Sequence, residues 1–193
     1  MTVDIEILLD VILHDIIPIT KKNILKGNKI FGAAILQKSN LNTLAIGANN
    51  EILNPLFHGE ISALNNFFKE KNNILTSDCV FLSTHEPCSL CLSAITWAGF
   101  NNFYYFFPYE DTKNKFNIPH DLNILKEVFN IEKGNYNNSN SYWESFAILD
   151  EISCLDNEKK QILNFKKDNI IRIYEILSKQ YQLTKFNSKI PLN

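Results

Sequence analysis

Residues 79–91 read CVFLSTHEPCSLC and pass from one kind of pattern to another. The compact, largely apolar run over 79–83 is typical of a buried strand. A helical pattern then extends from Cys88 to about Ala98, directly after Pro87, a residue favoured at the start of a helix. A buried strand that leads into a helix in this way indicates an α/β fold.

Patterns on both sides of this segment extend the prediction. Apolar residues three and four apart predict an amphipathic helix from Ile5 that ends before Pro18, and another helix from His58 to about Lys71. Short apolar runs predict a strand hairpin over 29–37 and 43–48, and a further strand over 102–107. The order helix, strand, strand, helix, strand, helix, strand predicts a helix-flanked sheet.

The chain has 193 residues, of which 45% are hydrophobic. That length suits one sizeable core and fits one domain better than two. A polar interval over 133–141 separates the core pattern from the rest. We therefore predict a domain over 1–141, which includes the N-terminal helix. An extension over 142–193, mostly helical from about Asn157 to Gln182, is expected to pack on that same domain.

The charge balance gives no general attraction for nucleic acid. The net charge is -2, from 19 basic and 21 acidic residues. Residues 1–157 carry 11 Lys and 18 acidic residues, or -7, whereas residues 158–193 carry 8 Lys or Arg and 3 acidic residues, or +5. A basic tail could contact nucleic acid, but we interpret it as a surface helix that carries lysines.

Targeting signals are not expected. Asp4 and Glu6 stand where a secretory signal would carry lysines, and no uninterrupted apolar run approaches the roughly 20 residues that cross a bilayer. Four cysteines are too few for a disulfide framework in a chain of this size. These features predict a cytoplasmic protein without membrane contact.

Cys88 and Cys91 carry the first chemical signal. On a helix, residues three apart face the same side, and the positive end of the helix dipole favours thiolates in the first turn. Two thiolates and the neutral imidazole of His58 balance the charge of a zinc ion and leave its fourth position open to water. The sequence therefore predicts one catalytic zinc per chain, held by His58, Cys88 and Cys91.

Glu60 lies two residues beyond His58, where its carboxylate can reach water on the metal. Zinc lowers the pKa of such water from nearly 16 to about 7. A nearby carboxylate can accept the released proton and later donate a proton to a leaving amine. We predict Glu60 as the catalytic residue.

Simpler interpretations of the same residues stay open. A Cys-x-x-Cys pair alone also fits a redox dithiol or half of a structural zinc site, and the upstream His-x-Glu favours catalysis. A structural zinc would need a fourth ligand, with Cys79, Cys154 and His85 as candidates. Cys79 lies in an apolar strand pattern and is expected in the core. His85 is expected in a pocket wall or a hydrogen-bonded loop.

The two clusters resemble the H-x-E and P-C-x-x-C signature of the cytidine and deoxycytidylate deaminase superfamily. The resemblance covers about residues 29–130. Within it, the segment 84–98 (THEPCSLCLSAITWA) is most like the branch that contains guanine deaminase and tRNA adenosine deaminase. Two departures stand out. Gly59 replaces the usual Ala, a change that we expect to be harmless to zinc binding, and Leu56 and Phe57 replace smaller or polar residues beside the pocket.

The resemblance implies a three-layer α-β-α sandwich with a central five-stranded mixed sheet, zinc as cofactor and a homodimer. The residue patterns show four strands, and we expect the fifth between Asn135 and Leu149. The resemblance also implies that an Asn after the second strand binds the substrate, and we prefer Asn49 to Asn50. The other candidate substrate contacts flank His58 or precede the Pro-Cys motif: Phe57, Gly59 and Glu86.

The implied activity of the domain over 1–141 is that of a zinc-dependent aminohydrolase. Such an enzyme would release ammonia from a small nucleobase or nucleoside, with a guanine-like purine favoured. One alternative is a tRNA adenosine deaminase, against which the acidic balance of residues 1–157 argues. Another is an inactive, zinc-stabilised interaction module, which would have no use for Glu60.

Overall fold

A five-stranded mixed sheet forms the centre of the computed structural model, which describes residues 3–70 and 73–193. Its strand order is β2-β1-β3-β4-β5. β1 pairs antiparallel with both β2 and β3, whereas β3, β4 and β5 run parallel to one another. The strands are β1 (Gly32–Gln37), β2 (Thr43–Ala48), β3 (Cys79–His85), β4 (Asn102–Phe107) and β5 (Glu144–Ala147).

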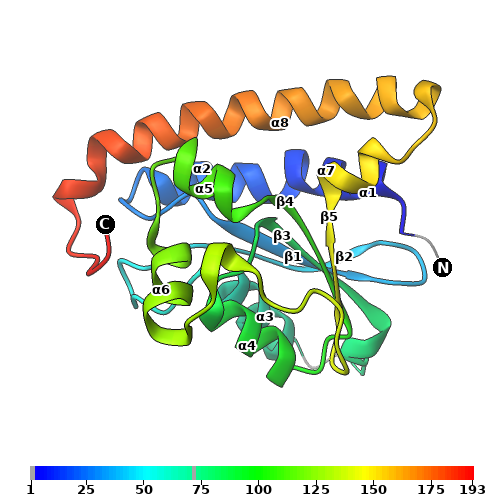
Figure 1. The fold of residues 1–193 in the computed structure, drawn as a ribbon, viewed down its shortest axis with the longest axis horizontal. Helices are drawn as coiled ribbons and strands as arrows, with labels where there is room; N and C mark the ends of the chain where they lie inside the picture. Colours follow the sequence, from blue (N-terminus) through cyan, green and yellow to red (C-terminus); the bar gives the residue numbers. More distant parts are fainter. Residues whose placement is uncertain (1–2, 71–72) are drawn as a thin grey trace.

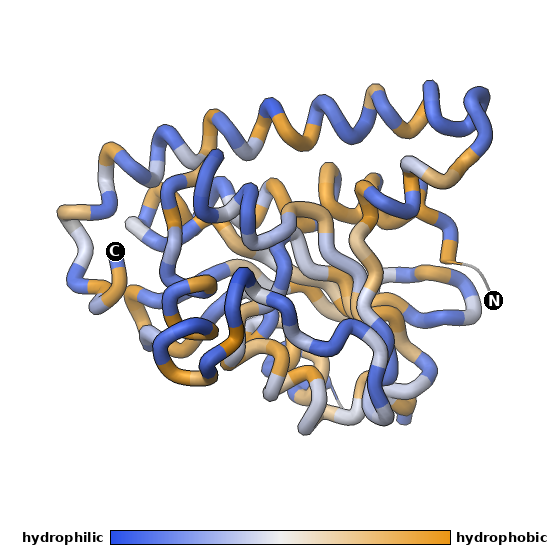
Figure 2. Tube along the Cα trace, in the orientation of Figure 1, coloured by the Kyte–Doolittle hydropathy of each residue, from blue (hydrophilic) through white to orange (hydrophobic). Residues whose placement is uncertain are grey.

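Helices cover both faces of the sheet, so the predicted three-layer arrangement is confirmed (Figure 1). One face carries α1 (Ile5–Val11), α2 (Ile17–Ile24), α7 (Ile148–Ser153) and α8 (Asn157–Thr184). The other carries α3 (Gly59–Lys69) and α4 (Ser89–Trp97). Two further helices follow β4, namely α5 (Tyr109–Asn114) and α6 (His120–Phe129). Hydrophobic residues gather along the sheet and the inner sides of the helices (Figure 2).

The N-terminal helical segment does not end before Pro18, so that prediction was wrong. A wider π-helical turn over Ile12–Ile16 precedes α2, and the Ile17 N–H donates to the Ile12 carbonyl five residues earlier. Pro18 then stands at the second position of α2, so its missing N–H falls at the junction of the two helical segments. The chain therefore stays helical to Ile24 and buries Ile12, Ile16, Ile17 and Ile24.

The fifth strand lies where it was expected, since β5 falls between residues 135 and 149. It joins the sheet at the edge next to β4 and leads into α7 and the 28-residue helix α8. α8 lies along α1 and α2 (Figure 1). The division of the chain at residue 141 stays a prediction. Within the described residues, no helix is both long and apolar enough to span a membrane.

Candidate metal centre

The three predicted metal ligands meet where α3 and α4 begin. His58 immediately precedes α3, Cys88 immediately precedes α4, and Cys91 lies in the first turn of α4. Their ligand atoms all lie within 4.8 Å of one another. The His58 Nδ1 atom is 3.4 Å from Cys88 Sγ and 3.6 Å from Cys91 Sγ. Tetrahedral zinc with Zn–S of about 2.3 Å and Zn–N of about 2.0–2.1 Å separates N and S by about 3.5 Å, so this donor set fits the ion.

The two thiols differ in their acid–base properties. A hydrogen bond from Cys91 lowers the pKa of the Cys88 thiol well below its ordinary value, and the contact with His58 lowers it further. Burial raises the pKa of Cys91 well above its ordinary value, and the charge of Cys88 adds to that effect. Cys88 is therefore the more acidic thiol of the pair, and the thiolate is the form of cysteine that binds metals.

Glu60 is buried beside these ligands. Its Oε2 atom is 3.4 Å from Cys91 Sγ, and its Oε1 atom accepts a hydrogen bond of 3.0 Å from the Ser83 hydroxyl. Burial raises the pKa of Glu60, and the negative charge of Cys88 raises it further. A carboxyl with a raised pKa can hold and release a proton closer to neutral pH, as a proton carrier must. Ser83 was not singled out from the sequence, because it lies inside an otherwise apolar strand.

A cavity of about 320 Å³ opens beside His58 and Cys88. Its charged lining includes Lys29, Glu51 and Asp121, none of which the sequence analysis had identified. Burial raises the pKa of Asp121 well above its ordinary value, and the charge of Cys88 raises it further. The apolar part of the lining comes from several segments and includes Phe31, Leu56, Ile118, Ile124, Ile190 and Leu192. The cavity is therefore an apolar chamber with a few polar groups next to the candidate metal ligands, which is typical of a small-molecule site.

Asn49 and Gly59 lie close to this centre, but their polar groups bind other protein atoms. The Asn49 Oδ1 atom accepts a 2.6 Å hydrogen bond from the Gly59 N–H, and its Nδ2 atom donates to Glu51 at 2.8 Å. A Cβ atom at Gly59 would lie 2.6 Å from the Gly32 Cα atom. Glycine at this position therefore allows α3 to approach β1. The expectation that the missing methyl is harmless to zinc binding stays a prediction.

Neither Phe57 nor Glu86 lines the cavity beside His58. Phe57 lines a separate groove beside α2, together with Asn50. Glu86 is buried, and one of its carboxylate oxygens accepts a 2.9 Å hydrogen bond from the Tyr109 N–H. Burial raises the pKa of Glu86 to about 7. Their contact with a substrate stays a prediction.

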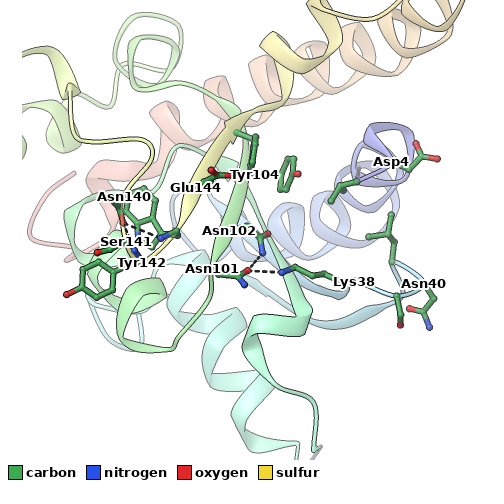
Figure 3. A pocket seen from close by; sticks show the side chains of 15 residues that line it. Asp4, Lys38, Asn40, Asn101, Asn102, Tyr104, Asn140, Ser141, Tyr142 and Glu144 are labelled. Carbon is green, nitrogen blue, oxygen red and sulfur yellow. Dashed lines mark hydrogen bonds between the residues drawn. The ribbon is translucent and has the colours of Figure 1, made fainter. Parts of the chain in front are cut away.

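A larger cavity of about 620 Å³ lies near the opposite ends of the parallel strands (Figure 3). Lys38, Asn101 and Asn102 lie together on one side of it, with the Lys38 ammonium 2.7 Å from Asn101 Oδ1. None of its lining residues is one of the predicted site residues. Ligands of open α/β sheets usually bind beyond the carboxyl ends of the strands. Cys88, which lines the smaller cavity, lies just beyond the carboxyl end of β3. The smaller cavity is therefore the better candidate for the active site.

Comparisons with known proteins agree with this geometry. The model of the cytidine and deoxycytidylate deaminase zinc-binding region matches residues 12–107, which include all three candidate ligands and Glu60. Guanine deaminase of Bacillus subtilis is 34% identical over 70 residues, a segment that covers 35% of this chain and 44% of that protein. The chain thus aligns with less than half of the length of this relative.

Two solved structures show the same fold. The guanine deaminase structure from Bacillus subtilis has a TM-score of 0.55 and 23% identity, and the match covers 72% of this chain and 87% of the other. Guanine deaminase from Nitrosomonas europaea has a TM-score of 0.53 and 17% identity, and the match covers 86% and 79%. With the matched zinc-binding region and its clustered ligands, the chain belongs to the cytidine and deoxycytidylate deaminase superfamily.

Proposed function

We propose that this protein is a zinc-dependent hydrolytic deaminase that releases ammonia from a small nucleobase or nucleoside. The observation that carries the proposal is the cluster of His58, Cys88 and Cys91 with the buried carboxyl of Glu60 at 3.4 Å from Cys91. A closed structural site has four protein ligands and needs no carboxyl beside them. Three ligands with an adjacent proton carrier are what hydrolysis of an amine requires.

Each residue has a separate role in this proposal. His58, Cys88 and Cys91 hold one zinc, which when bound would make water a nucleophile near neutral pH. Glu60 accepts a proton through its carboxylate and donates it to the amine that leaves. The Ser83 hydroxyl holds Glu60 Oε1 in place. Asp121 lies in the cavity wall, where its carboxyl group can form a hydrogen bond with a ring nitrogen or oxygen of the base.

A guanine-like purine is the preferred substrate. The support comes from the guanine deaminases that this chain resembles, and from proteins of the same fold solved in complex with 8-azaguanine and with 2,6-diaminopurine. A cavity of about 320 Å³ suits a single base. A homodimer in the cytoplasm belongs to the same proposal, as does a deaminase domain over 1–141 with an extension over 142–193.

An ammonia-release screen tests the activity. Zinc-loaded protein should release ammonia from at least one member of a panel of bases, nucleosides, nucleotides and pterins. Glu60→Gln should keep one zinc per chain and lose roughly 100-fold or more of the activity, because the proton carrier is gone. Exposed Glu110→Gln is the matched control and should retain wild-type activity. Near wild-type turnover by Glu60→Gln would remove this residue from the mechanism.

The same screen separates the alternatives. A tRNA adenosine deaminase would act on RNA, with binding that weakens steeply as salt rises, and not on free bases. A zinc-stabilised interaction module would bind zinc and release no ammonia from any compound. Either result would overturn the proposed function.

A further inference from the structure

Lys29 and Glu51 form an ion pair within the wall of the 320 Å³ cavity. The Lys29 Nζ atom is 2.6 Å from Glu51 Oε1, and the two residues are only 5% and 3% exposed. Burial of two charges is costly unless the hydrogen bonds of both groups are satisfied. Lys29 and Glu51 differ in how many of their hydrogen bonds are satisfied.

Both oxygens of the Glu51 carboxylate accept hydrogen bonds. Its Oε1 atom accepts from the Lys29 ammonium, and its Oε2 atom accepts from the Asn49 amide at 2.8 Å and from the Lys29 backbone N–H at 3.3 Å. The Lys29 ammonium has three N–H donors, and the described residues offer it one acceptor, Glu51 Oε1. A buried ammonium on a cavity wall with donors to spare favours an acceptor on whatever fills the cavity.

The position of the pair connects it with the reaction site. The same Oε1 atom that binds Lys29 lies 4.0 Å from His58 Nε2, so a single carboxylate separates the ammonium from the candidate metal ligand. Because Glu51 balances the charge of Lys29, the pair offers hydrogen-bond donors without a net positive charge. A neutral carbonyl oxygen suits such a site better than an anion does.

We propose that Lys29 is a specificity-determining residue whose ammonium donates a hydrogen bond to a ring carbonyl oxygen of the bound base. This assignment rests on the proposed function and narrows the substrate to bases that carry both an amine and a ring carbonyl. Guanine and cytosine have both groups, whereas adenine lacks the carbonyl. A base without the oxygen leaves an N–H donor of the buried ammonium without an acceptor, and sites of this kind reject such analogues strongly.

Equilibrium binding of bases that carry no amine tests the assignment without any turnover. The probes are two pairs that differ by a ring carbonyl, hypoxanthine with purine and 2-pyrimidinone with pyrimidine. Isothermal titration calorimetry of the zinc-loaded protein should show at least one carbonyl probe binding about tenfold or more tighter than its partner. Lys29→Met should reduce this ratio to near one, and Lys29→Arg, which keeps a donor, should restore most of it.

Two further variants serve as controls for the effect of Lys29→Met. Lys26→Met removes an exposed lysine outside this cavity and should leave the ratio unchanged. Should Lys29→Met fail to fold because it leaves Glu51 buried without its partner, the double variant Lys29→Met with Glu51→Gln removes both charges together. The double variant should also lose the preference for the carbonyl.

The outcomes separate this assignment from the proposed function. A wild-type ratio near one, a ratio that survives removal of Lys29, or no binding of either carbonyl probe would overturn the role of Lys29. A protein that shows the preference and loses it with Lys29, yet releases no ammonia from any compound, would keep the role of Lys29 and refute the deaminase.

Discussion

His85 shows how burial fixes the charge state of a single side chain. The imidazole is 2% exposed and packs against Phe31, Phe107 and Tyr174, with ring centroids 4.6, 4.9 and 5.3 Å away. Its Nδ1 atom lies 3.0 Å from the Thr84 hydroxyl. Burial lowers the pKa of His85 well below 6.5, so the ring is neutral in the folded protein. His85 thus ends β3 inside an aromatic cluster that shares Phe31 with the cavity lining.

The neutral state of His85 predicts part of the acid sensitivity of the fold. In the unfolded chain the pKa of this imidazole is about 6.5, so below that pH the unfolded chain binds a proton that the folded chain excludes. The stability due to neutral His85 is thus fully present above about pH 6.5 and is lost as the pH falls toward the folded-state pKa. His85→Phe should flatten the dependence of the unfolding free energy on pH below about 6.5, by up to about 1.4 kcal/mol per pH unit.

Urea unfolding at a series of pH values measures this slope. His14→Gln is the control, since His14 is an exposed histidine on the N-terminal helical segment. An unchanged slope in His85→Phe would mean that the folded protein accommodates a charged imidazole at this position.

Residues close together in sequence were the easiest to predict. Cys88 and Cys91 are three residues apart at the start of α4, so local geometry brings them together, and His58 and Glu60 are neighbours in the chain at the start of α3. Lys29, Glu51 and Asp121 come from three distant segments, and their partners are set by the packing of loops around the sheet. No local pattern marks such residues, which is why the sequence indicated the metal site but not the charged lining of the cavity.

At the scale of elements, one lysine connects α8 to the start of the chain. The Lys166 ammonium lies 2.6 Å from Asp10 Oδ1 and 2.9 Å from Glu6 Oε1, both on α1. Lys166→Met should lower the unfolding free energy by about 1 kcal/mol, because a partly exposed ion-pair network contributes on this scale. Equilibrium urea unfolding at low salt measures the loss.

The neighbouring lysine provides the matched control. Lys167 contacts Asn164 and Asp168, both on α8 itself, so Lys167→Met removes a charge without loosening the contact with α1. Equal losses in the two variants would show that the ion pairs to α1 add nothing to the docking of α8.

The strands with a continuous apolar run were predicted, whereas several elements late in the chain, among them the ten-residue helix α6, were not. β3 is buried over its whole length, and its apolar run marks it clearly. β5 has four residues, none of them fully buried, so its position followed from the resemblance and not from a pattern. α5 has six residues, too few for an apolar stripe to repeat, and was not predicted. The π-helical turn before Pro18 also leaves no signal in the spacing of apolar residues.

At the scale of the whole molecule, part of the cavity wall comes from a segment far from the metal ligands in sequence. Ile190, Pro191 and Leu192 follow α8 and line the same cavity as His58 and Cys88. Ile190 is 7% exposed. A base in the cavity would therefore contact apolar atoms that only the docking of α8 brings into place.

Ile190→Ala should weaken the binding of hypoxanthine to the zinc-loaded protein by roughly three- to tenfold, because the apolar area that it removes contributes about 1 kcal/mol. Leu183→Ala is the control, since Leu183 lies on α8 and is 82% exposed. Calorimetric titration of both variants compares a residue of the cavity wall with one that faces solvent. If Ile190→Ala and Leu183→Ala bind hypoxanthine equally well, the residues after α8 do not enclose the ligand, and the base must lie nearer to His58 and Lys29.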